Sequence, residues 1–279
     1  MNETTAAAIA TSLEQRFGEE LRVPPAAAHA TLAGIAARRT HRRYSARAVD
    51  AEVIRLLCAI ALSSPSKSDL QQRDIVIVSD PQLRSAIADL LPDSPWVRAA
   101  PAFLVFCGNG GRIMQVARLR GKPFPNNHLD LFFNAVGDAA IALATFVNAA
   151  EAIGLGCCPI SEIRNHAAQI DALLHLPPHV FPFAGLCLGW PAGGGKLSPR
   201  LGLETTVHEN RYGNIDVPRS VAAYDARRAA VQPYEKQRHA ERYGRSEDYG
   251  WSEDKARQYS VPNRADFGAY IKRKGFVLE

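Results

Sequence analysis

The alternation of apolar and polar positions predicts helices and strands that follow one another along the middle of the chain. From Val49 to Leu62 the apolar positions recur at helical spacing, and Asp50 stands where a helix N-cap is expected. The short apolar runs "DIVIVSD" and "PAFLVFCG" are typical of strands, and a helical pattern from Gln82 to Leu91 separates them. The run "VFPFAGLCLGWP" predicts a further buried strand that ends at Pro191. The pattern therefore indicates a mixed α and β protein.

The segment from Leu129 to Ile153 is the longest stretch with few helix breakers, and it is apolar on more than one face. Such a helix must be covered on several sides, so we expect it in the centre of the protein or in a subunit interface. It ends in "GLG", where Gly154 or Gly156 can adopt the left-handed conformation that closes a helix.

The two ends of the chain differ from this central part. Leu13 and Phe17 lie at helical spacing before the break at Pro24-Pro25, which predicts a helical N-terminal extension. Residues 219–279 are rich in charged and aromatic side chains, which predicts helical segments that wrap the core or a partner subunit. The expected domains are an N-terminal extension, a core and a C-terminal helical extension, at residues 1–34, 35–215 and 216–279.

The composition fits an ordinary globular protein: 47% of the 279 residues are hydrophobic and 22% are charged. The net charge is +5, but the 33 Lys and Arg are interspersed with 28 Asp and Glu, which favours small anions such as phosphates over nucleic acid. No stretch looks apolar over the roughly 20 residues that a membrane span requires. We therefore expect a soluble, cytoplasmic protein without a membrane or nucleic-acid partner.

The cysteines and histidines do not indicate a metal centre. The 5 cysteines include no CxxC spacing, and the adjacent pair Cys157-Cys158 lies in an apolar stretch, which suits buried, reduced thiols. None of the 8 histidines belongs to a recognisable metal or nucleophile motif. The expectation is no bound metal and no cysteine chemistry.

Four segments carry groups that could bind a ligand. The cluster "RRTHRRY" at 38–44 suits a phosphate because arginine donates to phosphate oxygens in pairs, although a solvated basic face has the same composition. The loop "SSPSKSDLQQRD" at 63–74 offers both donors and acceptors, as the pyrimidine edge of a flavin or a nucleobase demands; a plain polar turn is the alternative.

The other two segments are rich in glycine. In "GLGCCPISE" at 154–162, the glycines would let the main chain approach a flat ligand closely. The run "GGGKLSPRL" at 193–201 delivers Lys196 and Arg200 on a flexible loop, which suits a phosphate or the electron-rich side of a reduced flavin; an ordinary exposed loop is equally compatible.

The order of these segments resembles the flavin reductase and oxygen-insensitive nitroreductase family, from about Ala36 to Tyr212. "RRTHRRY" resembles the family's "HRSIRxF" motif, and "PSKSDLQ" resembles its "PSxxNxQ" loop. The long helix ending in "GLG" and the strand "FAGLCLGWPA" follow in the same order, and "SPRL" and "HENRY" are similar to "KPRL" and "HENxY". The resemblance implies an α+β fold with a central, mostly antiparallel sheet flanked by helices, in an intertwined homodimer with FMN at the interface.

The resemblance also implies roles for individual residues. Arg38, Thr40 and Arg200 would bind the FMN phosphate, and Arg42 would face the N1/O2 edge of the flavin. Ser161 and Glu162 would offer backbone N–H groups near N5. The complete set of implied FMN contacts is Arg38, Arg39, Thr40, Arg42, Pro65, Ser66, Lys67, Ser68, Asp69, Gln71, Pro159, Ile160, Ser161, Glu162, Lys196 and Arg200. Arg245 is the candidate for substrate contact, and no side chain is assigned as a catalytic acid or base.

Three positions depart from the family pattern. Asp69 replaces the usual asparagine, Ser161-Glu162 replaces a Gly-Gly pair, and Ser198 replaces the lysine of "KPRL", for which Lys196 could substitute. A carboxylate at position 69 would accept a hydrogen bond from flavin N3–H but repel an anionic reduced flavin. These departures bear on the substrate and on the flavin potential.

The resulting hypothesis is an FMN-dependent oxidoreductase that takes hydride from NADPH or NADH and reduces a nitroaromatic, a quinone or a flavin. One alternative is an FMN enzyme acting on a specific metabolite, as in the dehalogenating or flavin-fragmenting relatives. A second alternative, from another class, is a phosphate-binding or RNA-binding module that uses "RRTHRRY" and "YIKRKGF".

Overall fold

The computed structural model describes residues 2–279 and divides them into two units. Unit 2 comprises Thr40–Gly194 and Arg264–Glu279 and holds the sheet, whereas unit 1 comprises Met1–Arg39 and Gly195–Asn263 and is helical. The central part and the last residues of the sequence thus belong together, as do the N-terminal extension and most of the C-terminal part.

Unit 2 is built on one antiparallel sheet that has four strands among the described residues, in the order β1-β2-β4-β3. The strands are β1 (Arg73–Ile77), β2 (Ala102–Asn109), β3 (Gly156–Ile160) and β4 (Val180–Gly189). All three strand pairs are antiparallel. This confirms the predicted α+β class and its antiparallel sheet. Strand β3 was not predicted, because the sequence analysis treated "GLGCCPISE" as a glycine-rich loop.

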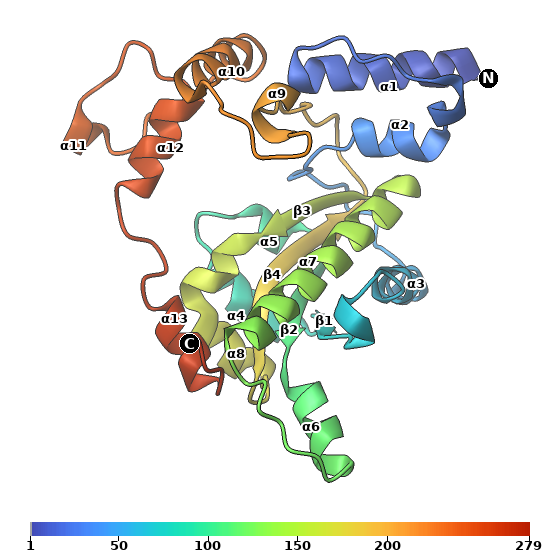
Figure 1. Ribbon diagram of the computed structural model, residues 1–279, viewed down its shortest axis with the longest axis vertical. Helices are drawn as coiled ribbons and strands as arrows, with labels where there is room; N and C mark the ends of the chain where they lie inside the picture. The colour runs from blue at the N-terminus through green and yellow to red at the C-terminus, as the bar shows by residue number, and fades with distance from the viewer. Residues whose placement is uncertain (1) are drawn as a thin grey trace. The chain divides into compact units, whose positions relative to one another are not determined.

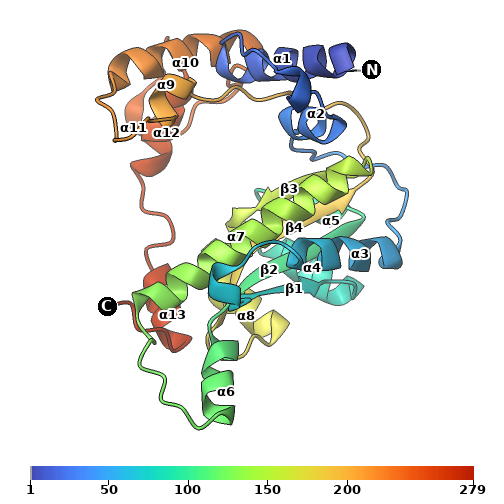
Figure 2. The ribbon, with the colours of Figure 1, turned by 45° about the vertical axis from the view of Figure 1, so that its right-hand side comes forward.

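Each face of the sheet is covered by its own group of helices, because side chains of successive strand residues point to opposite faces. On one face, Leu104, Phe106 and Leu186 pack under α3 (Ala51–Leu62) and α7 (Leu129–Ala152). Figures 1 and 2 show α7 running along this face. On the other face, Phe103 and Val105 pack under helices α4 (Pro81–Asp89), α5 (Trp96–Ala99) and α8 (Ala167–Leu174).

The helix α7 combines features of a core helix with those of an exposed apolar one. It is long and apolar enough to cross a membrane by length and composition, so the expectation that no stretch of the chain meets this requirement was wrong. Its packing on the sheet buries residues from Leu131 to Ala150, including the charged Asp138. This packing identifies α7 as the central helix of this unit. It ends as predicted, with Gly154 at a φ of 84°.

The remaining elements of unit 2 lie around the sheet. They are η2 (Lys67–Asp69), α6 (Gly111–Leu119), η3 (Ser161–His166) and α13 (Phe267–Arg273). Tyr270, Ile271 and Phe276 from the end of the chain pack against Leu131 and Phe181. The last part of the C-terminal segment therefore packs on the core of unit 2.

Unit 1 consists of short helices that pair locally. The N-terminal part forms α1 (Asn2–Phe17), η1 (Pro25–Ala27) and α2 (Ala30–Ala36), and α1 packs on α2. The C-terminal part forms α9 (Leu203–Thr206), α10 (Val217–Val231), α11 (Ala240–Tyr243) and α12 (Trp251–Tyr259). Tyr224 of α10 meets Trp251 of α12 edge to face at 5.0 Å between ring centroids. The helical character predicted for both ends of the chain is present.

Candidate functional site

Of the three predicted phosphate contacts, Arg38 and Arg200 belong to unit 1 and Thr40 belongs to unit 2. In unit 1, Arg16 of the N-terminal extension binds the backbone next to Arg38 and Arg200. Arg16 of α1 is 7% exposed and donates through Nε to the Ala36 carbonyl at 2.9 Å. It also donates to the carbonyls of Arg38 and of Ser198, the latter at 3.1 Å. The Arg16 carbonyl in turn accepts from the Arg200 amide at 2.6 Å. The Arg16 side chain thus binds the backbone of two basic segments that are far apart in the sequence, one at Arg38 and one at Ser198.

The other basic side chains of unit 1 lie near these segments along the chain. Arg39 donates to the Gly195 carbonyl at 3.2 Å, which places it next to the glycine run before Lys196. Lys196 lines a cavity of about 630 Å³ together with Arg228 and Arg238. Arg245, the predicted substrate contact, is exposed in the loop between α11 and α12. The cavity beside Lys196 thus carries basic side chains together with the acidic Glu235 and Asp254.

The beginning of unit 2 lies along the edge of the sheet next to β3. Thr40 forms a parallel bridge with Cys157, and the His41 amide donates to the Cys157 carbonyl at 3.0 Å. Arg42 is exposed, and its guanidinium lies 5.1 Å from the ring centroid of Trp96. The segment that contains Thr40 and Arg42 is therefore held beside the strand that leads to Pro159, Ile160, Ser161 and Glu162.

The packing around Gly156 contradicts the expectation that the glycines of "GLGCCPISE" leave room for a flat ligand. A Cβ on Gly156 would lie 2.8 Å from His41 and 2.9 Å from Pro191, so protein atoms occupy the space that the sequence analysis left for a flat ligand. Gly156 is needed for packing and Gly154 for ending α7. Cys157 and Cys158 are buried, as predicted.

The residues after β3 carry side-chain contacts that the family's glycine pair could not form. Ser161 accepts a hydrogen bond from Arg264 at 3.3 Å, and the carboxylate of Glu162 accepts one from the buried Ser94 hydroxyl. Burial and the neighbouring Arg264 lower the pKa of the nearby Arg164. Where the family pattern has two glycines, this chain therefore has a carboxylate that is hydrogen-bonded to Ser94, with Arg164 and Arg264 nearby.

The loop between α3 and β1 presents the predicted ring contacts. Lys67, Ser68, Asp69 and Gln71 are exposed, and Pro65 and Ser66 precede them. Ser68, Asp69 and Gln71 have φ values of 50°, 54° and 52°, in the left-handed region. That conformation costs a residue other than glycine roughly 1 kcal/mol or more, and aspartate or asparagine tolerates it best. The choice of aspartate at position 69 has a conformational reason as well as the predicted electrostatic one.

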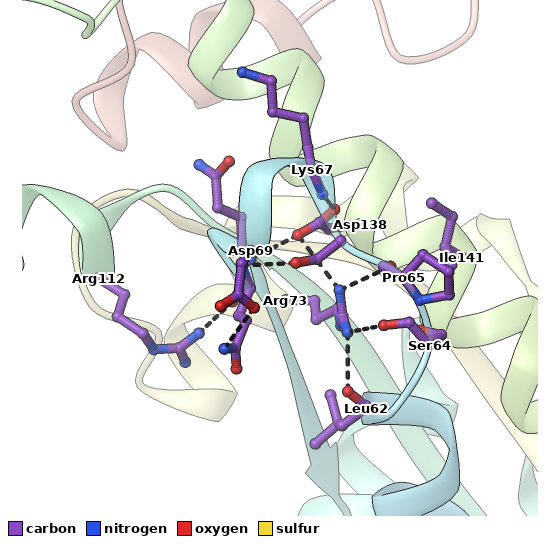
Figure 3. A network of polar contacts seen from close by, with 12 residues as sticks. Leu62, Ser64, Pro65, Lys67, Asp69, Arg73, Arg112, Asp138 and Ile141 are labelled. Carbon is purple, nitrogen blue, oxygen red and sulfur yellow. Dashed lines mark hydrogen bonds and ion pairs between the residues drawn. The ribbon is translucent and has the colours of Figure 1, made fainter.

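A buried ion pair, which the sequence analysis did not identify, underlies this loop (Figure 3). Asp138 of α7 accepts from the Lys67 amide at 3.0 Å and from the Gln72 amide at 2.8 Å. It also lies 3.5 Å from Arg73. Arg73 donates to the carbonyls of Leu62 and Ser64 at 2.9 and 2.6 Å. The available signal was a carboxylate in the middle of a mostly apolar helix, since buried charges are kept only with partners.

The donor set of each unit, taken by itself, fits a different part of FMN. The exposed loop offers hydroxyl, ammonium, carboxylate and amide groups, which complement the mixed donors and acceptors of a flavin pyrimidine. Unit 1 offers guanidinium and ammonium groups, which suit a phosphate. Among the described residues, no cluster of His, Cys, Asp or Glu could hold a metal ion.

Comparison with known proteins finds two matching family models. The nitroreductase family model matches residues 35–190, and the model of the C-terminal domain of that family matches residues 198–279. This chain belongs to the nitroreductase family. The family match spans both the sheet-bearing part and the basic C-terminal segments.

Named relatives within the nitroreductase family match over most of their length. An "FMN reductase [NAD(P)H]" of Bacillus subtilis is 31% identical and is covered over 95% of its length by 86% of this chain. An "Oxygen-insensitive NADPH nitroreductase" of Salmonella typhimurium is 34% identical, with 87% of its length and 79% of this chain covered. The solved structure of Bacillus megaterium NfrA2 has a TM-score of 0.80 at 29% identity, covering 89% of this chain and 98% of that one.

Proposed function

We propose that this member of the nitroreductase family is an FMN-dependent oxidoreductase that transfers hydride from NADPH or NADH to a small acceptor such as a nitroaromatic, a quinone or a flavin. The observation that carries the proposal is the family match over residues 35–190 and 198–279, combined with the donor sets above. The names of the relatives, an FMN reductase and an NADPH nitroreductase, support both the cofactor and the electron donor.

FMN would supply the hydride chemistry, so the side chains of the protein bind and orient it. We propose that Arg38, Thr40 and Arg200 bind the phosphate with Arg39 and Lys196 nearby, and that Arg42 faces the N1/O2 edge. The loop residues Pro65, Ser66, Lys67, Ser68, Asp69 and Gln71 would line the ribityl chain and the pyrimidine. Pro159 and Ile160 at the end of β3 would contact FMN, and Ser161 and Glu162 at the start of η3 would offer backbone N–H groups near N5. Arg245 remains the candidate for substrate contact.

The test is an absorbance spectrum of the purified protein followed by anaerobic titration with NADPH and with NADH. We expect flavin absorption bands that bleach on addition of the reduced nicotinamide. A colourless protein that also fails to bind added FMN would contradict the proposal. The nicotinamide that reduces the flavin at the lower concentration is the preferred electron donor.

We further propose that the protein is a cytoplasmic homodimer. Apolar side chains remain exposed on α7 and α3, notably Phe133 at 70% and Leu56 at 59%. A subunit interface would cover exposed apolar side chains of this kind. Sedimentation at micromolar concentration should give a dimer, and a monomer there would contradict the assignment.

A second candidate is an FMN enzyme that acts on one specific metabolite. It is favoured by Glu162, whose carboxylate is held by Ser94 at a position where the family pattern has glycine. A fixed charge at this place would select among acceptors rather than admit many. Tight flavin retention with turnover of nitroaromatics near background would favour this candidate.

A further inference from the structure

The loop proposed to contact the flavin pyrimidine holds a conformation that its own sequence disfavours. Three of its residues other than glycine, Ser68, Asp69 and Gln71, are left-handed. Such a conformation persists only when surrounding contacts determine it. The side-chain contacts within the exposed part of the loop are modest: the Gln71 amide donates to the Ser66 hydroxyl at 3.3 Å, and the Gln71 side chain donates to Asp69 at 3.1 Å.

The stronger contacts come from below the loop, where a carboxylate binds both of its ends. Asp138 is 2% exposed, and its two oxygens accept from the amides of Lys67 and Gln72, one oxygen each. These amides flank the three left-handed residues. A charged acceptor makes shorter and stronger hydrogen bonds than a neutral one. Asp138 therefore fixes the distance between the two ends of the strained segment.

Arg73 completes the arrangement from the strand side (Figure 3). Its guanidinium neutralises Asp138 and donates to the carbonyls of Leu62, Ser64 and Pro65. Arg73 thus binds the carbonyls of the segment that leads into the loop, and Asp138 binds the amides of the loop itself. Removing one partner of such a pair leaves the other as an uncompensated buried charge.

We infer that Asp138 is a positioning residue for flavin binding: through the amides of Lys67 and Gln72 it sets the conformation in which the loop meets the pyrimidine edge. The inference rests on the proposed FMN site. Asp138 is buried beneath the loop and acts on the flavin only through the loop backbone. Its removal should weaken binding of the ring and leave binding of the phosphate unchanged.

The test compares Asp138→Asn with the wild-type protein by hydrogen exchange and by flavin binding. In the flavin-free protein, amides of residues 63–72 should exchange at least tenfold faster in the variant, while those of β2 and α4 remain unchanged. The Kd values for FMN and for riboflavin, which lacks the phosphate, should both rise at least tenfold and by the same factor. Unchanged loop exchange, or faster exchange with both Kd values within twofold of wild type, would overturn the inference.

Two further variants keep the test decisive if Asp138→Asn does not fold. Lys67→Pro and Lys67→Ala both remove the lysine side chain, but only proline also removes the amide that donates to Asp138. Ser66 has a φ of −133° and a ψ of 154°, a conformation that is compatible with a following proline. The proline variant should bind riboflavin at least fivefold more weakly than the alanine variant. Equal binding by the two would overturn the inference.

The matched control is Asp171→Asn, which removes a carboxylate of the same unit that pairs with Lys274 at 2.9 Å and lies away from the loop in the hydrogen-bond network. It should leave loop exchange and both Kd values unchanged. If Asp171→Asn alters them as much as Asp138→Asn does, general destabilisation explains the effect and the inference fails. A wild-type protein that binds neither flavin would instead contradict the proposed function itself, and the inference with it.

Discussion

The loop of unit 2 and the basic segments of unit 1 are each bound by a buried charged side chain of their own. The two side chains have opposite charge. The carboxylate of Asp138 accepts from loop amides and is neutralised by Arg73. The guanidinium of Arg16 donates to the carbonyls of Ala36, Arg38 and Ser198. Each of these two side chains thus binds the backbone of a segment that is proposed to contact the cofactor.

The difference in sign has a consequence for what each segment can bind. Beneath the loop the negative charge of Asp138 and the positive charge of Arg73 cancel. The loop can therefore present both donors and acceptors while the ion pair below it adds little net electrostatic field. In unit 1 the buried side chain of Arg16 is itself a cation, and it adds to the positive charge of Arg38 and Arg200. The first arrangement suits a neutral ring, and the second suits a phosphate. Binding of FMN and riboflavin can separate the two contributions.

The largest effect is expected from removing the phosphate contacts themselves. Replacing Arg38 and Arg200 together by Ala should weaken FMN binding roughly 100-fold or more, since hydrogen bonds to charged groups are worth about 1.5 to 3 kcal/mol each. Riboflavin binding should change little. The measurement is the Kd by flavin fluorescence and the flavin content after dialysis.

The double replacement of Arg118 and Arg120 by Ala is the control, because it removes two exposed positive charges of α6 and its C-cap. It changes the net charge equally and should leave FMN bound. Unchanged flavin content in the variant lacking Arg38 and Arg200 would refute the assignment of the phosphate site.

An intermediate effect is expected from Arg16→Met, which retains an unbranched apolar stem but loses all donors to the carbonyls of Ala36, Arg38 and Ser198. Buried carbonyls without donors cost about 1 to 3 kcal/mol, so we expect roughly tenfold weaker FMN binding and a lower Tm. Arg22→Met, at an exposed position, is the control. If Arg16→Met weakens FMN and riboflavin equally, its role is not specific to the phosphate side.

The sequence predicted the elements of this fold well where local patterns are strong. Asp50 caps α3 through the Glu52 amide as expected, and the boundaries of α7 and β4 agree closely with their apolar runs. Strand β3 was missed because a run of five residues with two cysteines and a proline has little β pattern, and its pairing with β4 is a tertiary contact.

The sequence predicts the residues that are proposed to contact the ligand. It does not predict the buried residues that hold them in place. The basic cluster and the polar loop are visible as local composition. Arg16 and Asp138 each lie in a helix that also carries other charged residues. Asp138 is 71 residues from its partner Lys67, and Arg16 is 182 residues from its partner Ser198. No local pattern relates residues at such separations. A charge in the middle of a mostly apolar helix signals a buried partner but does not identify it.

The smallest effect is expected from Asp69→Asn, which tests whether charge on the loop surface reaches the flavin despite the neutralised Asp138 beneath it. Asparagine tolerates the left-handed φ of 54° and keeps an acceptor for flavin N3–H, so FMN should stay bound. Removing the negative charge favours the anionic reduced flavin, and the midpoint potential should therefore rise. Because Asp69 is exposed, solvent screens the effect, and a rise of about 10 to 30 mV is expected. A potential that is lowered, or unchanged within a few millivolts, would show that Asp69 does not face the flavin. Loss of FMN would show instead that the carboxylate holds the loop, since Asp69 also accepts from the Gln71 side chain at 3.1 Å.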